Sequence, residues 1–142
     1  MFTNLRHLLV LLALTASVPI RADLVVVTPA RGEVGPLSRE DVINIFMGRF
    51  RQFPRGGVAH PVDLPEHHPD RARFYLQLIN KSPAEVNAYW ARLTFSGKTR
   101  PPPQARTVSE AIDWLARQEG AIGYLDRSLI DARHRIVLEL GR

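Results

Sequence analysis

The sequence of 142 residues contains no cysteine. This absence excludes disulfide bonds, catalysis by a thiol, and any zinc or iron–sulfur site that depends on cysteine ligands. Lysine is also scarce, with 2 lysines against 17 arginines. The formal net charge of +5 falls to +3 when residues are counted from Asp23 onward. This excess describes a mildly basic domain rather than a nucleic-acid-binding polycation, so we expect no nucleic-acid partner.

The apolar run near the N-terminus is too short to cross a bilayer. The run Leu8–Ile20 has 13 residues, whereas a membrane-spanning helix needs about 20. It follows a short segment with one arginine and ends just before Ala22, which is the order of a secretory signal peptide. We predict a signal peptide over residues 1–22 and one domain over residues 23–142, exported to the periplasm. An uncleaved membrane anchor is the alternative, because the residues before Ala22 make an imperfect cleavage site.

The sequence also lacks a recognisable catalytic motif. No Gly-x-Ser-x-Gly pattern occurs in it, which excludes the nucleophile elbow that hydrolases place at a strand-to-helix turn. Ser38, Ser82 and Ser109 all fall at expected helix N-caps, where a hydroxyl already has a structural role. We therefore expect no enzymatic activity and no cofactor.

Apolar patterns predict four strands and four helices. The β-branched run that follows Asp23 is typical of a buried strand, and Pro61 places the second strand at a sheet edge or a bulge. Ser82 and Thr107 each begin a capping-box pattern that marks the start of a helix. The expected strands are Leu24–Thr28, Val58–Leu64, Ala121–Leu125 and Arg135–Leu140, and the expected helices cover residues 38–48, 70–79, 82–97 and 107–120. Strands separated by helices in one small chain indicate an α/β layer fold, with Trp90 and Trp114 expected in its core.

The densest group of polar side chains lies between residues 60 and 70. It consists of His60, Asp63, Glu66, His67, His68 and Asp70. Histidine and carboxylate side chains bind zinc, copper and nickel, yet no His-x-x-x-His pair fixes two ligands on one helical face, so we predict no metal site. We interpret the group as a solvated loop at the mouth of the fold. A metal site is the first alternative, and contact with an anion or a peptide is the second, with Arg71 as the best donor.

A second loop carries basic and aromatic residues in alternation. Its arginines are Arg49, Arg51 and Arg55, and its aromatic residues are Phe50 and Phe53. This composition is also found in nucleic-acid-binding patches, but an exported protein rarely meets nucleic acid. We interpret the arginines as surface residues and the phenylalanines as anchors of the loop. Docking to an acidic partner is the alternative.

Four short motifs, taken in order, resemble one family. The segment Leu37–Arg49 resembles the leucine-small…isoleucine-phenylalanine-x-glycine-basic segment of phosphate-type periplasmic solute-binding proteins, and Gly120–Tyr124 resembles the GAIGY strand of the same family. Between them, Ala88–Trp90 and Phe95–Lys98 match small single-lobe, substrate-binding-like proteins of phosphate ABC transporters. The resemblance covers residues 24–140. It implies an α/β fold, namely a single lobe of a type II periplasmic-binding-protein-like fold with a mixed sheet flanked by helices.

Two departures from the family limit what the resemblance implies. Full members clamp their ligand between two lobes, whereas this chain has residues for one. Full members also carry an arginine and an aspartate-glycine-serine-glycine-threonine loop that holds phosphate at a helix N-terminus. The equivalent stretch Asp63–Arg71 lacks the glycines and the hydroxyls, and Glu66 and Asp70 would repel an anion. The candidate ligand-binding residues that remain are His67, His68, Asp70 and Arg71.

These observations predict an exported, non-enzymatic module related to the substrate-binding proteins of phosphate ABC transporters. It would bind a ligand, with a small oxyanion as the candidate, or a partner such as a membrane transporter or a signalling protein, and it could form oligomers. One alternative is a periplasmic accessory protein that has lost small-ligand binding. Another is a metal-binding or catalytic protein that uses the histidine loop.

Overall fold

The computed structural model describes residues 23–141. The predicted signal peptide over residues 1–22 lies outside this range and stays a prediction. Within the described residues, no helix combines the length and the apolar character that crossing a membrane requires.

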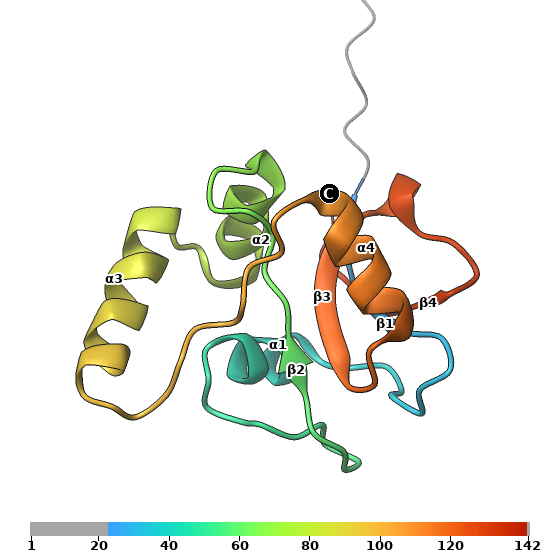
Figure 1. The fold of residues 1–142 in the computed structure, drawn as a ribbon, viewed down its shortest axis with the longest axis horizontal. Coiled ribbons are helices and arrows are strands. Elements are labelled where there is room, and N and C mark those ends of the chain that lie inside the picture. Colours follow the sequence, from blue (N-terminus) through green and yellow to red (C-terminus); the bar gives the residue numbers. More distant parts are fainter. Residues whose placement is uncertain (1–22, 142) are drawn as a thin grey trace, which may run out of the picture.

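A four-stranded mixed sheet forms the centre of the fold (Figure 1). Its strands are β1 (Leu24–Pro29), β2 (His60–Pro61), β3 (Ala121–Asp126) and β4 (His134–Glu139), in the order β2-β3-β1-β4. Strand β1 pairs antiparallel with both β3 and β4, and β2 pairs parallel with β3. Every residue of β1 is buried, which confirms the interpretation of its β-branched run.

Strand β2 is shorter than the sequence predicts. Pairing in β2 covers two residues of the expected Val58–Leu64, with single bridges formed by Val58 on one side and Asp63 on the other. The hydrogen bonds to β3 are donated by the His60 and Val62 N–H groups, so Pro61, which has no N–H, faces the side of the strand away from β3, as an edge position allows. The expected position at a sheet edge is confirmed, because β2 is the outermost strand next to β3.

The four predicted helices are present, and each has a side-chain N-cap. They are α1 (Arg39–Phe46), α2 (Pro69–Ile79), α3 (Pro83–Phe95) and α4 (Val108–Arg117). Ser38 and Ser82 form complete capping boxes. Thr107 caps α4 through the Glu110 N–H, while the Glu110 carboxylate pairs with Arg106 instead of returning to the cap. Ser109 therefore lies inside α4 rather than at its N-cap, which corrects the prediction for that residue.

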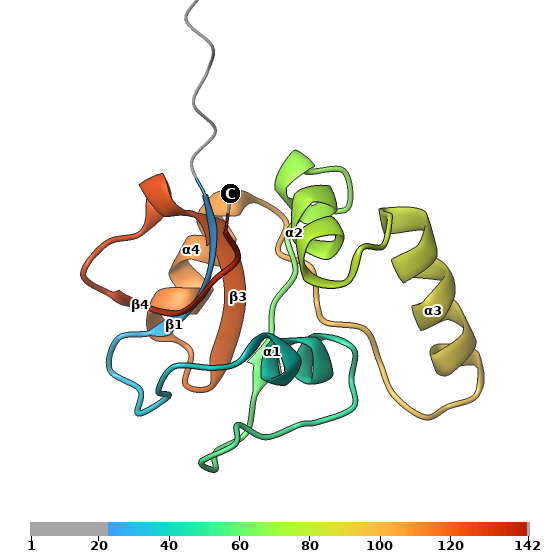
Figure 2. The same cartoon turned by 180° about the vertical axis from the view of Figure 1, so that it is seen from behind.

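Helices cover both faces of the sheet. Gly123 of β3 faces α4, because a Cβ atom at this position would lie 2.8 Å from Leu115 Cδ1. The next residue, Tyr124, points to the opposite face, where its ring stacks on Phe74 of α2 with 3.8 Å between centroids. Phe46 of α1 meets the Phe74 ring edge-on at 4.9 Å. Helix α4 lies in front of the sheet in Figure 1 and behind it in Figure 2, and α1 and α2 pack on the other face.

Helix α3 lies farther from the sheet than the other helices (Figures 1 and 2). Only Val86 and Trp90 of this helix are buried. The core position predicted for Trp90 is thus confirmed. Trp114 is packed against the core but only partly buried, so its predicted core position is confirmed only in part.

Candidate functional site

The candidate site begins at a buried carboxylate that follows β2. The side chain of Asp63 is buried and accepts hydrogen bonds from four donors. One carboxylate oxygen accepts from the Leu64 N–H at 3.0 Å and from the Tyr124 hydroxyl. The other accepts from Arg71 Nε at 3.1 Å and from the Tyr75 hydroxyl at 2.9 Å. We name Asp63, Arg71, Tyr75 and Tyr124 the Asp63 cluster.

Arg71 is the cation of this cluster, and it is buried as deeply as its partner. The two side chains are each 3% exposed. Nη2 of Arg71 donates to Asn87 Oδ1 at 3.1 Å, and the guanidinium lies over the Tyr75 ring at 5.3 Å from its centroid. Burying a carboxylate and a guanidinium is tolerated only when each satisfies the other. Asp63 and Arg71 therefore act first as structural partners.

Burial and the Asp63 carboxylate also control ionisation in the cluster. Both raise the pKa of Tyr75 and of Tyr124 well above the ordinary tyrosine value, so the two hydroxyls remain protonated donors. Burial opposes the charge of Arg71, but the attraction and the hydrogen bond from Asp63, with smaller contributions from Tyr75 and Tyr124, together outweigh it and raise the pKa of the guanidinium. Arg71 therefore keeps its positive charge beside the Asp63 carboxylate.

A chain of polar contacts extends from the cluster toward the surface. Asn87 of α3 accepts from Arg71 and donates through Nδ2 to Glu66 Oε1 at 2.6 Å. Glu66 also accepts from Gln104 Nε2 at 3.0 Å. These two hydrogen bonds lower the pKa of the exposed Glu66 carboxyl. The chain ties α3 and the segment before α4 to the loop after β2.

The N-terminus of α2 already has partners for its first backbone donors. The helix begins at Pro69, which has no N–H. The Asp70 N–H donates to His68 Nδ1 at 3.1 Å, and the Arg71 N–H donates to the His68 carbonyl oxygen at 3.0 Å. A helix N-terminus binds an anion through unpaired N–H groups. This terminus therefore offers few donors to an anion.

The four candidate ligand residues lie close together but have different roles in the fold. His67 is exposed, and His68 caps α2. Asp70 pairs with Arg73 at 2.9 Å, while Arg71 is buried beneath them. The expectation of a solvated loop is therefore wrong for Asp63, because charge compensation by the buried Arg71 lets its carboxylate enter the core. Among residues 23–141, no three histidine or acidic side chains converge as a metal site would require.

Tyr75, Tyr124 and Asn87 were not identified from the sequence as members of the site. Tyr75 and Tyr124 were each assigned to apolar patterns, which fits their burial but not the role of their hydroxyls. The signal that could have found Asp63 is its position between Val62 and Leu64, since an acidic residue between two apolar neighbours suggests burial with a partner.

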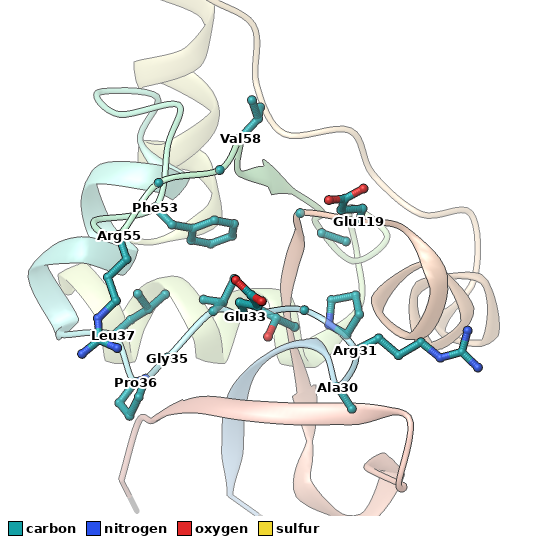
Figure 3. Close-up of a pocket in the computed structure, with 18 of the residues that line it drawn as sticks. Ala30, Arg31, Glu33, Gly35, Pro36, Leu37, Phe53, Arg55, Val58 and Glu119 are labelled. Carbon is teal, nitrogen blue, oxygen red and sulfur yellow. The ribbon is translucent and has the colours of Figure 1, made fainter.

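A separate pocket lies at the opposite end of the sheet, where β1 ends and β3 begins (Figure 3). It has a volume of about 1480 Å³ and is formed by the loops at residues 30–37 and 53–58 and by the segment 116–121. We call it the loop pocket. Phe53 anchors one wall and is only 5% exposed, as predicted. Arg55 and Glu119 lie on opposite sides of the pocket and Glu33 lies between them (Figure 3), and none of the three has an ion-pair partner among the described residues.

The fold with this arrangement of sheet and helices is that of a single lobe of a periplasmic-binding-protein-like α/β domain. Two solved structures have a similar fold. An ABC-type phosphate transport receptor from Vibrio cholerae superposes with a TM-score of 0.63 at 14% identity, covering 82% of this chain and 45% of the receptor. A putative phosphate ABC transporter substrate-binding protein with bound phosphate from Clostridium perfringens gives a TM-score of 0.66 at 18% identity, covering 82% of this chain and 44% of that one.

The chain thus has a phosphate-binding-protein-like fold and spans less than half the length of either structure. The fold expected from the four sequence motifs is confirmed. The two structural neighbours are named as transport proteins rather than enzymes. No protein-family model and no curated protein matches the sequence significantly.

Proposed function

We propose that this protein is an exported, non-enzymatic binding module with the fold of a phosphate receptor lobe, which docks to a partner protein instead of capturing free phosphate. The Asp63 cluster carries the proposal. A phosphate ion would need the Arg71 guanidinium, and the Asp63 carboxylate already holds it at 3.1 Å. Glu66 and Asp70 add negative charge at the same loop, and His68 and Pro69 leave the start of α2 short of donors.

A single lobe is also expected to bind an anion more weakly than a pair of lobes. A ligand enclosed between two lobes leaves water, and each of its electrostatic contacts becomes stronger in the lower dielectric. A ligand on one lobe remains exposed on one side. We therefore expect the monomer to bind free phosphate with a Kd near or above about 1 mM.

A second candidate function is oxyanion binding completed by another surface. One observation favours it: Nη1 of Arg71 is buried and has no hydrogen-bond partner among residues 23–141. This group could donate to an anion held jointly with a second copy of the chain or with a partner protein. The fold of the two phosphate-transport neighbours is compatible with this candidate.

Isothermal titration with phosphate at several protein concentrations separates the two candidates. Weak binding at every concentration supports the docking module, and binding that tightens as the protein self-associates supports the shared site. Arg71→Lys is the informative variant, since it keeps the charge beside Asp63 but loses the guanidinium fork. Arg73→Lys is its matched control on the same helix. Micromolar binding by a demonstrated monomer, lost in Arg71→Lys alone, would overturn the docking proposal.

Export is the remaining part of the proposal, and it rests on the apolar run Leu8–Ile20. Intact-mass analysis of protein recovered from the periplasm of a bacterial host tests it. The mature chain should begin at Asp23 or within a few residues of it. A periplasmic or membrane-bound product that keeps Met1 would contradict cleavage.

A further inference from the structure

Two segments of the chain carry cations and no anions. Residues 42–62 contain three arginines and no acidic residue, and residues 86–109 contain three arginines, one lysine and no acidic residue. Elsewhere in the described chain, basic side chains commonly pair with acidic ones, as Arg133 does with Asp131 at 2.9 Å. The two segments are therefore exceptions to the balanced charge of the rest of the domain.

The fold brings these two segments into contact. The Tyr89 hydroxyl of α3 donates to the Met47 carbonyl oxygen at 2.7 Å. A Cβ atom on Gly48 would lie 3.4 Å from Thr99 Cγ2, so the turn after α1 lies against the segment after α3. In Figures 1 and 2 the loop that follows α1 extends toward the C-terminal end of α3. The cations that flank Gly48 and Thr99 in sequence consequently share one side of the molecule.

We name this side the basic face. Its members are exposed: Arg49, Phe50 and Arg51 follow Gly48, Lys98 and Arg100 flank Thr99, and Arg92 and Phe95 belong to the last turn of α3. Nη1 of Arg49 donates to the uncharged Asn44 Oδ1 at 3.4 Å. None of the five cations forms an ion pair with any residue of the described chain. Their charge is therefore available to an external anion.

The two aromatic residues of the basic face project into solvent. Phe95 is 96% exposed and Phe50 is 56% exposed. The expectation that Phe50 anchors its loop is thus wrong, because its backbone N–H is held by the Asn44 carbonyl oxygen and the ring is left outside the core. Phe50 lies between Arg49 and Arg51 in the sequence, and Phe95 lies three residues from both Arg92 and Lys98.

We propose that the basic face binds the surface of a membrane that contains anionic phospholipids. Cations near such a surface are attracted by the lipid phosphates without fixed geometry. An aromatic ring with basic neighbours enters the boundary between headgroups and acyl chains. A bilayer accepts one projecting ring such as Phe95 without a complementary pocket, whereas a protein interface requires a packed apolar core. Two aromatic rings that are separated by cations therefore fit a bilayer surface better than a protein interface.

Vesicle co-sedimentation of the full chain tests the proposal. The probes are vesicles of phosphatidylcholine alone and vesicles that also contain phosphatidylglycerol. We expect binding to exceed the neutral baseline only on the anionic vesicles and to decrease as salt screens the attraction. Lys98→Glu with Arg100→Glu should lower the association constant about thirtyfold or more, from a factor of about five for each cation removed. Any contribution of residues 1–22 is common to all variants and cancels in this comparison.

Matched variants make the result specific to the basic face. Arg31→Glu with Arg117→Glu changes the net charge equally at the loop pocket and should leave binding within about threefold of the parent. Phe95→Ser should weaken binding about tenfold, while Leu76→Ser, which alters a residue 57% exposed on α2, should not. Circular dichroism confirms that each variant is folded.

Three outcomes would overturn the proposal. The first is equal binding to neutral and anionic vesicles, and the second is an equal loss in both charge-reversal pairs. The third is binding of poly-L-glutamate through Lys98 and Arg100 with no binding to anionic vesicles, which would assign the basic face to an acidic protein.

Discussion

The Asp63 cluster and the loop pocket lie at opposite ends of one sheet and use charged groups in opposite ways. In the cluster, Asp63 accepts from four donors and Arg71 is held on two sides. In the loop pocket, Arg55 and Glu119 are exposed and form no ion pair with the described residues. The charges of the Asp63 cluster are compensated within the fold, although Nη1 of Arg71 has no hydrogen-bond partner among residues 23–141. The charges of Arg55 and Glu119 at the loop pocket are not compensated in this way.

The largest effect should come from removing the centre of the cluster. Asp63→Ala leaves Arg71 buried without its counter-ion and two tyrosine hydroxyls without their acceptor. Breaking a buried pair on one side costs about 3–5 kcal/mol, so the free energy of unfolding should fall by that amount in denaturant titrations. Glu110→Ala, which removes the exposed pair with Arg106, is the control and should cost no more than about 1 kcal/mol. Similar losses in both variants would contradict the structural role of the cluster.

An intermediate effect on stability should appear at Gly120, where two backbone segments that line the loop pocket approach each other closely. Gly120 has φ of +77°, and a Cβ atom there would lie 2.3 Å from the Val58 carbonyl oxygen. Gly120→Ala should therefore cost about 2–4 kcal/mol, from overcrowding and from left-handed backbone together. Gly56, with φ of +100° and no atom within 4 Å, isolates the backbone effect, and Gly56→Ala should cost about 1 kcal/mol. If the two substitutions cost the same in thermal unfolding, the close approach at Gly120 has no energetic weight.

The smallest effect separates the two neighbouring histidines. His68 caps α2 by accepting from the Asp70 N–H, whereas His67 is exposed. His68→Ala should lower stability by about 0.5–1 kcal/mol, as the loss of a helix cap does. His67→Ala should change it by less than about 0.5 kcal/mol. A loss of bound zinc in either variant, measured by metal analysis, would instead support the metal site that the sequence left open.

The sequence predicted the elements of the fold better than the roles of its polar residues. The strand predicted over Leu24–Thr28, the N-cap at Ser38 and the capping box at Ser82 are present because burial and capping leave local patterns in a sequence. Asp63 was assigned to a solvated loop and Arg71 was considered only as a donor to an anion, because their pairing depends on the start of α2 folding back over β2. The hydroxyls of Tyr75 and Tyr124 reach Asp63 from 12 and 61 positions away. Contacts across such separations have no signature in one sequence.

The pairing of β1 has a consequence for the order of events during folding. Both neighbours of this central strand come from the far end of the chain, since Leu24 pairs with Asp126 and Val25 pairs with Glu139. Closing loops of this length has a large entropic cost before any pairing compensates it, and such topologies fold slowly. A nascent chain can form α1 to α4 early, but its sheet cannot assemble until β3 and β4 have left the ribosome. During that interval the apolar strand β1 has no pairing partner.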